Sequence, residues 1–215
     1  MTSHQPGLRQ RKKQRTYQTL SDTAIALFLE KGFDQVSVAE VAAAAEVSKP
    51  TLFRYFPAKE DLVLHRFADH EDEAARVVRE RAADEAPLAA LERHFLAGLE
   101  RRDPVTGLSD DARVLAFHQL LYSTPSLVAR LFEYTNRSED ALAATLRELL
   151  PDRGPLADVT ARLAAGQIIA AQRILALDNW RQIADGGTAD AVHPRAVAAA
   201  RHAFGLLRSG LADLR

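Results

Sequence analysis

The residues best suited to chemistry stand between Ser48 and Phe56, where hydroxyl groups, two cationic groups and a phenol follow one another closely. If this segment is helical, Leu52 and Phe56 are one turn apart and lie together on its inner side. The outward side then carries mostly phosphate and base partners: Ser48, Lys49, Pro50, Thr51, Arg54 and Tyr55. A short helix with one side pinned in a core and the other rich in hydrogen-bonding groups suits the major groove of DNA.

Two further helices are expected to position this segment. A helix from about Arg11 to Lys31 places Leu20, Ala24, Leu27 and Phe28 on one face, and Gly32 suits its C-cap. Ser37, with Glu40 three residues later, predicts a capping box for a short second helix, and Ser48 is a suitable N-cap for the third. Two short helices joined by a tight turn after a longer packing helix form a helix-turn-helix.

The same stretch resembles the DNA-binding domain of TetR-family transcriptional regulators. The resemblance covers roughly residues 15–65 without a gap and rests on many fixed spacings. These lie in the run Leu20-x3-Ala24-x2-Leu27-Phe28-x3-Gly32-Phe33-x3-Ser37-Val38-x2-Val41-Ala42-x2-Ala45-x-Val47-Ser48-Lys49-Pro50-Thr51-Leu52-Phe53-x-Tyr55-Phe56-x2-Lys59-x2-Leu62. Beyond residue 65 the chain resembles the family only in being helical and of suitable length.

The resemblance implies specific DNA contacts. Base-edge contacts are expected from Lys49, Pro50, Thr51 and Arg54, with Pro50 against a thymine methyl and Lys49 on guanine or a phosphate. Phosphate contacts are expected from Ser37, Ser48, Phe53, Tyr55 and Lys59. An upstream basic run either tracks the DNA backbone, enters a flanking minor groove, or is only a disordered solubilising tail: Arg9, Arg11, Lys12, Lys13 and Arg15.

Two positions depart from the family pattern. Phe53 stands where the family usually has tyrosine, so a hydroxyl contact to phosphate is lost while the ring can still pack on sugar. Glu46 replaces the usual turn glycine. Either Glu46 is forced into left-handed backbone space, at a cost on the order of 1 kcal/mol, or the turn differs slightly.

Composition and charge bound the class of protein. The chain has 215 residues and no cysteine, which excludes disulfides and thiolate catalysis and fits the cytoplasm. No apolar run is long enough for a membrane span, and the polar, basic start does not read as a secretory signal. Residues 1–66 carry ten basic and seven acidic side chains, a net +3, and the remainder is −4. This asymmetry suits a polyanion at one end, although a solvated charged face is the ordinary alternative.

The chain is predicted to be all-α, with about nine helices. Residues 1–10 are expected to be a disordered tail, 11–65 the helix-turn-helix domain, and 66–215 a helical domain for effector binding and dimerisation. Beyond the third helix, the expected helices are 59–84, 87–101, 110–122, 125–150, 156–184 and 189–211.

In the family the larger domain holds a ligand cavity, and its last two helices form the interface of a homodimer. Residues 156–184 are apolar on more than one face, which favours cover on both sides. The last helix has an apolar stripe of Val197, Ala200, Phe204, Leu207 and Leu211. Candidate pocket residues, each of which could equally be core or surface, are Phe95, Phe117, His118, Leu121, Tyr122, Phe132, Tyr134, Gln167 and Gln172.

The resulting hypothesis is a dimeric repressor that binds palindromic operator DNA and is released by a small, largely hydrophobic effector. A ligand-dependent activator and a helical protein-binding adaptor are the alternatives. An enzyme is disfavoured, because no H-E-x-x-H, G-x-S-x-G, Walker or dinucleotide motif occurs, so no catalytic residue, metal or cofactor is expected. The histidines and acids of residues 65–73 radiate around a helix and read as a solvated patch rather than a metal cluster.

Overall fold

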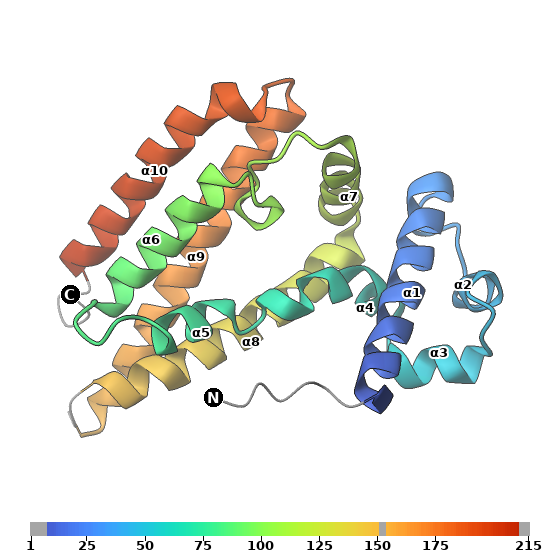
Figure 1. Ribbon diagram of the computed structural model, residues 1–215, viewed down its shortest axis with the longest axis horizontal. Helices are drawn as coiled ribbons and strands as arrows, with labels where there is room; N and C mark the ends of the chain where they lie inside the picture. Colours follow the sequence, from blue (N-terminus) through green and yellow to red (C-terminus); the bar gives the residue numbers. More distant parts are fainter. Residues whose placement is uncertain (1–7, 151–153, 211–215) are drawn as a thin grey trace. The chain divides into compact units, whose positions relative to one another are not determined.

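The computed structural model describes residues 8–150 and 154–210, and within them the chain is all-helical, as predicted (Figure 1). Ten α-helices and two short 3-10 helices follow one another in the described part. Their bounds are α1 Leu8–Lys31, α2 Val38–Ala44, α3 Lys49–Tyr55, α4 Lys59–Leu64, η1 His65–His70, α5 Glu73–Arg79, α6 Pro87–Glu100, η2 Pro104–Thr106, α7 Ala112–Ser123, α8 Pro125–Leu149, α9 Leu156–Ala184 and α10 Ala189–Gly210.

The chain divides into two compact units. The N-terminal unit comprises Met1–Ala68 and Ala116–Leu131, and the C-terminal unit comprises Asp69–Leu115 and Phe132–Arg215. Helices α7 and α8 therefore contribute residues to both units. By packing, residues 116–131 group with the first helices, whereas the sequence placed them in the larger functional domain; the functional assignment of that domain stays a prediction.

The N-terminal unit is built around the inner face of α1. Leu20, Ala24 and Phe28, three of the four residues predicted to share that face, are buried, and Leu27 is partly buried beside them. Helix α1 packs against α2 and α4, and α2 packs against α3 (Figure 1). Helix α1 begins at Leu8, so residues 8–10 of the expected disordered tail are helical; residues 1–7 lie outside the described range.

The prediction of a single long helix over residues 59–84 is wrong. The structure has α4, then η1, then α5 across this stretch. The sequence holds no proline or glycine there, so no local breaker marks the interruption. The cause is the lack of a continuous apolar stripe: between His65 and Glu73, Phe67 is the only large apolar side chain, so little packing holds an α-helix in place.

The C-terminal unit packs α6, α9 and α10 around one apolar core (Figure 1). The η2 loop is docked closely on α9. Asn179 of α9 is buried and donates a hydrogen bond to the Thr106 carbonyl at 2.9 Å. Gly107 has a positive φ of 72°, and a Cβ there would lie 1.9 Å from the Ala176 carbonyl oxygen. Only glycine fits this approach of loop to helix.

Helix α9 has two different apolar faces. One face is buried in the core of the C-terminal unit and carries small and branched side chains: Ala157, Ala161, Ala164, Ala165, Ile168, Leu175 and Ile183. The opposite face exposes Leu156 (65%), Val159 (46%), Leu163 (59%) and Ile174 (58%), which we call the α9 stripe. The prediction that this helix is apolar on more than one side is confirmed.

The apolar stripe predicted on the last helix is used differently from the expectation. Ala200, Phe204 and Leu207 are buried in the core of their own chain, and Val197 packs against that core. Leu206 is instead the large apolar residue that α10 exposes, at 62%. The stripe therefore pairs α10 with α6 and α9 of the same chain; Leu211 lies outside the described residues.

Candidate nucleic-acid interface

Helix α3 is pinned on its inner side, as predicted. Leu52 is fully buried, and Phe56, the C-cap residue, is 3% exposed. Tyr17 of α1 meets the rings of Tyr55 and Phe56 edge-on, with centroids 4.8 and 5.2 Å away. These contacts hold α3 against α1 and fix which of its sides faces outward.

The serine caps predicted for α2 and α3 are present. The Ser48 hydroxyl accepts the Thr51 backbone N–H at 3.2 Å and lies 2.8 Å from the Thr51 hydroxyl. The Ser37 hydroxyl accepts the Glu40 backbone N–H at 3.1 Å. The reciprocal half of the predicted capping box is not formed, because the Glu40 carboxylate pairs with Lys31 at 2.6 Å. An ion pair offers this carboxylate a charged partner, which a backbone N–H does not.

The outward side of α3 is polar and cationic with one exposed ring. Lys49, Pro50, Phe53 and Arg54 are exposed, and Thr51 and Tyr55 are half-buried. The Lys49 ammonium lies 5.9 Å from the Phe53 ring centre, and the Arg54 guanidinium 5.8 Å from that of Tyr55. Every residue predicted to face outward is at least partly accessible; the base and phosphate contacts assigned to them stay predictions.

Glu46 does occupy left-handed backbone space, with φ at 54°. The Val47 N–H reaches the Ala42 carbonyl at 2.9 Å, and the Glu46 N–H reaches the Ala43 carbonyl at 3.1 Å. This pair of bonds is a Schellman cap, in which the left-handed position normally favours glycine. The turn between α2 and α3 keeps its geometry and carries the backbone strain of a side chain there.

Lys59, a predicted phosphate contact, is already engaged within the protein. Its ammonium donates to the Phe33 carbonyl and lies 4.1 Å from the centre of the Phe33 ring and 5.3 Å from that of Phe28. The side chain thus closes the turn after α1. A phosphate contact by Lys59 requires its ammonium to leave or share the carbonyl.

The basic residues before the core of α1 lie on helical turns rather than on an extended arm. Arg11, Lys12, Lys13 and Arg15 are all exposed on the first turns of α1. A helix is too wide for the minor groove of B-DNA, which admits extended arms and single side chains. Of the two DNA-contacting roles considered, contact with the phosphate backbone fits this conformation; the Arg9 side chain lies outside the described residues.

The predicted pocket residues fall into three groups. Phe117, His118 and Leu121 are buried in the N-terminal unit, and Tyr122 packs beside them, 6.0 Å from His118 between ring centres. Phe95 is buried in the C-terminal unit beside Phe204. Two others are accessible: Phe132 is 55% exposed, with the Arg173 guanidinium 5.9 Å from its ring, and Gln167 is exposed.

Burial controls the protonation of His118. Desolvation lowers its pKa to about 4, so the imidazole is neutral at physiological pH. The neutral imidazole lies beside Phe117 and Tyr122, with ring centres 6.0 Å from each. Tyr134, in the C-terminal unit, has its pKa raised far above the ordinary value, mainly by burial and next by the Glu71 carboxylate.

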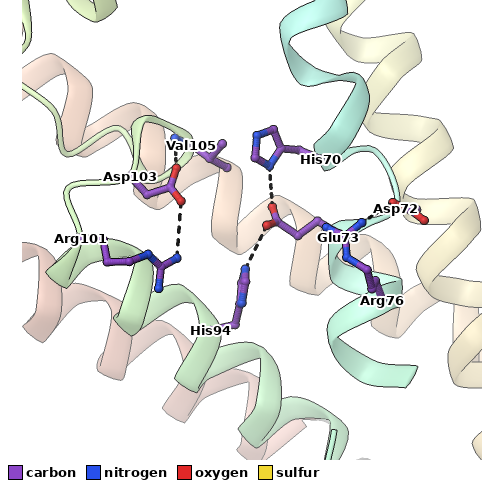
Figure 2. A network of polar contacts seen from close by, with 8 residues as sticks. All are labelled: His70, Asp72, Glu73, Arg76, His94, Arg101, Asp103 and Val105. Atoms are coloured by element: carbon purple, nitrogen blue, oxygen red, sulfur yellow. Dashed lines mark hydrogen bonds and ion pairs between the residues drawn. The ribbon is translucent and has the colours of Figure 1, made fainter. Parts of the chain in front are cut away.

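One polar network was missed by sequence reasoning (Figure 2). Glu73 of α5 lies between two imidazoles, with its carboxylate 2.9 Å from His70 Nδ1 and 3.2 Å from His94 Nε2 of α6. Burial alone would raise the pKa of Glu73, but hydrogen bonds from both histidines outweigh it and lower the pKa to about 2. His94 lies 21 residues away along the chain, so no local spacing signals this trio.

The Glu73 carboxylate and the two imidazoles form an ion-paired network. Within the described residues, no group of three or more His, Asp or Glu side chains is arranged to hold a metal ion. In the same part of the chain, no helix combines the length and apolarity needed to cross a membrane.

A comparison with known protein families matches residues 20–65, which span the second half of α1 and all of α2, α3 and α4. They match the sequence model described as bacterial regulatory proteins, tetR family. The chain is 38% identical over 140 residues to the HTH-type transcriptional regulator TcmR of Streptomyces glaucescens, covering 65% of this chain and 61% of TcmR. The match thus spans less than two thirds of that relative's length.

Solved structures share the fold over most of the chain. Native NalD of Pseudomonas aeruginosa, a secondary repressor of a multidrug efflux pump, aligns with a TM-score of 0.57 and 17% identity, covering 89% of this chain and 96% of NalD. FadR of Bacillus subtilis, solved with stearoyl-CoA, aligns with a TM-score of 0.51 and 21% identity, covering 90% and 98%.

The N-terminal unit contains a helix-turn-helix formed by α2 and α3, and the C-terminal unit is helical throughout its described residues. Residues 20–65 match the tetR family of bacterial regulatory proteins, and most of the chain shares its fold with solved structures such as NalD and FadR.

Proposed function

We propose that this chain is a dimeric transcriptional repressor that binds a palindromic operator through α3 and is released by a small, largely apolar effector. The observation that carries the proposal is α3 itself. Its inner side is fixed by Leu52 and Phe56, and its outer side presents Lys49, Thr51 and Arg54. A helix so anchored keeps its outward groups in one register, which reading base edges requires.

The proposed contacts divide into specifying and positioning groups. Lys49, Pro50, Thr51 and Arg54 contact base edges, and Ser37, Ser48, Phe53, Tyr55 and Lys59 contact the sugar-phosphate backbone. Ser48 and Thr51 share a hydrogen bond, so Thr51 is held in place before DNA arrives. Phe53 has no hydroxyl, so its contribution is packing on sugar.

The α9 stripe supports dimerisation through the last two helices. Four large apolar side chains are exposed along one side of a helix whose other side is buried in its own chain. Cover by the same stripe of a second copy removes this surface from water in a self-complementary way. A dimer sets two copies of α3 about 34–36 Å apart, one turn of B-DNA, so that each reads half of a palindrome.

An apolar effector is supported by the character of the helical unit and by the stearoyl-CoA held by FadR. A ligand that prefers a conformation with another spacing of the two α3 helices weakens DNA binding by its differential affinity. The pocket residues stay proposed as Phe95, Phe117, His118, Leu121, Tyr122, Phe132 and Gln167. Phe132 and Gln167 are exposed, so they can line a pocket only if the effector or the second copy of the chain covers them.

Operator selection from random duplexes tests the proposal, followed by release with candidate ligands. Tyr55→Ala and Lys59→Ala weaken binding to all sequences, whereas Thr51→Ala changes which sequence is preferred. Binding that falls steeply with salt separates a DNA-binding regulator from a protein-binding adaptor. Unchanged affinity and preference in all three variants contradicts the contact assignment, and tighter operator binding with ligand favours an activator.

A further inference from the structure

We infer that Arg130 is a positioning residue for DNA binding: through Asp61 it holds the turn by which the chain leaves α3. The inference rests on the proposed function, because it takes α3 to be the helix that enters the groove. All the residues involved belong to the N-terminal unit.

Asp61 fixes the connection between α3 and α4. Ala58, the N-cap of α4, has no side chain that can accept a hydrogen bond, and its backbone N–H donates to Asp61 Oδ2 at 3.0 Å. Ala58 lies three residues after Tyr55, the last residue of α3. The Asp61 carboxylate therefore sets the path of the chain between Tyr55 and Lys59, two of the proposed phosphate contacts.

Arg130 of α8 holds this carboxylate at two points. Its Nε donates to Asp61 Oδ1 at 2.8 Å and its Nη2 donates to Oδ2 at 3.2 Å. A bidentate pair fixes the orientation of a carboxylate as well as its place. The side chains of Arg130 and Asp61 are 32% and 20% exposed, whereas the Arg66–Asp22 pair of the same unit is 47% exposed at both ends. Reduced solvent screening makes the Arg130 pair the stronger of the two.

Helix α4 has a separate anchor that does not involve Arg130. The buried Ser21 hydroxyl of α1 donates to the Leu62 carbonyl at 2.7 Å, and Leu62, Val63 and Leu64 are buried. Loss of Arg130 should therefore loosen the turn before α4 while α4 itself stays packed. This separation makes a positioning role distinguishable from a merely structural one.

The test compares Arg130→Met with wild type on a selected operator over a range of salt concentrations. We expect operator affinity to fall roughly tenfold, in keeping with the coupling energies of contacting residues. The salt dependence should become shallower by about one phosphate contact, because Tyr55 and Lys59 flank the loosened turn. Asp61→Asn should have a similar effect, and the double variant should be no weaker than either single variant.

Two further variants keep the result interpretable. Arg147→Met removes the same charge from the same helix and breaks its 2.6 Å pair with Asp158, and it should leave operator affinity within about twofold of wild type. Arg130→Lys keeps the charge with one contact point and should recover part of the affinity.

Wild-type affinity and salt slope in Arg130→Met would overturn the inference. The inference would also be overturned if Arg130→Met had a lowered melting temperature but bound the operator with wild-type affinity at temperatures well below it. The pair between Arg130 and Asp61 would then serve stability alone. A wild-type chain that binds no duplex is a different result, which overturns the proposed function and the inference with it.

Discussion

The exposed faces of α3 and α9 differ in chemistry, and the difference indicates two kinds of partner. Helix α3 is seven residues long and presents cations and hydroxyl groups. Helix α9 is 29 residues long and presents leucine, valine and isoleucine. Cationic and hydrogen-bonding groups match a hydrated polyanion, whereas exposed branched side chains match another protein surface.

The two units also hold their helices by different means. Helices α2 and α3 are too short to be stable alone, and each has a serine cap and a buried inner side. In the C-terminal unit, α6 and α9 have no side-chain N-cap, and distant ion pairs such as Arg102–Asp190, at 2.7 Å, tie the elements together. Helices α2 and α3 therefore depend on local capping, whereas the C-terminal unit depends on contacts between residues far apart along the chain.

The largest effect is expected from substitutions in the α9 stripe, the apolar one of the two exposed faces. Leu163→Glu combined with Ile174→Glu places charges in the α9 stripe, where they face their copies in a dimer. Like charges brought together at an interface cost several kcal/mol, so we expect a monomer in sedimentation and operator binding weaker by at least about 100-fold.

Arg162→Glu, an exposed site off the stripe, is the matched control and should leave the dimer intact. A double variant that still sediments as wild type would contradict the assignment of α9 to the interface.

The next largest effect is expected from removing the buried anchor of α3. Leu52→Ala empties a fully buried site under α3 and should lower the free energy of unfolding by about 3 kcal/mol, with loss of operator binding. Urea unfolding measures the change. Leu29 of α1 is 42% exposed, so Leu29→Ala should lower the free energy of unfolding by well under 1 kcal/mol. An equal loss of stability in the Leu29 and Leu52 variants would show that Leu52 does not anchor α3.

A smaller effect tests the ion-paired network of the C-terminal unit. The pKa of Glu73 is lowered from 4.5 to about 2 in the folded chain, so its ionised form stabilises the fold above pH 4.5. Glu73→Gln should cost roughly 2 kcal/mol at pH 6, and the difference from wild type should shrink as the pH falls from 4.5 toward 2.

Unfolding by urea at a series of pH values measures this difference. Glu148→Gln, at an exposed glutamate of α8, should show little effect at any pH. A Glu73→Gln penalty that does not change below pH 4.5 would argue against the pairing with His70 and His94.

The smallest effect tests the backbone strain at Glu46, in the turn before α3. Glu46→Gly should stabilise the protein by about 1 kcal/mol, because glycine adopts a φ of 54° without strain. Ala44→Gly, at the exposed end of α2, should instead destabilise by up to about 1 kcal/mol. Equal signs for both changes in urea midpoint would show that Glu46 is not strained.

Much of the fold could be read from sequence alone because its signals are local. Ser37 and Ser48 mark helix starts, Gly32 and Gly186 mark ends with positive φ, and apolar spacing marks inner faces. The left-handed conformation of Glu46 was one of the two alternatives that the sequence offered, because the bonds of the turn close within a few residues. The accessible side of α3 followed from the positions of Leu52 and Phe56.

Other features depend on residues far apart along the chain, and only tertiary structure decided them. The placement of Glu73 against His94 and the use of the α10 stripe within its own chain carry no local signal. Apolar periodicity predicts that one face of a helix is covered, but it does not identify the element that covers it. Charge says that a side chain seeks a partner, not that Lys59 closes on Phe33 or Arg130 on Asp61, because those distances exist only once the helices have packed.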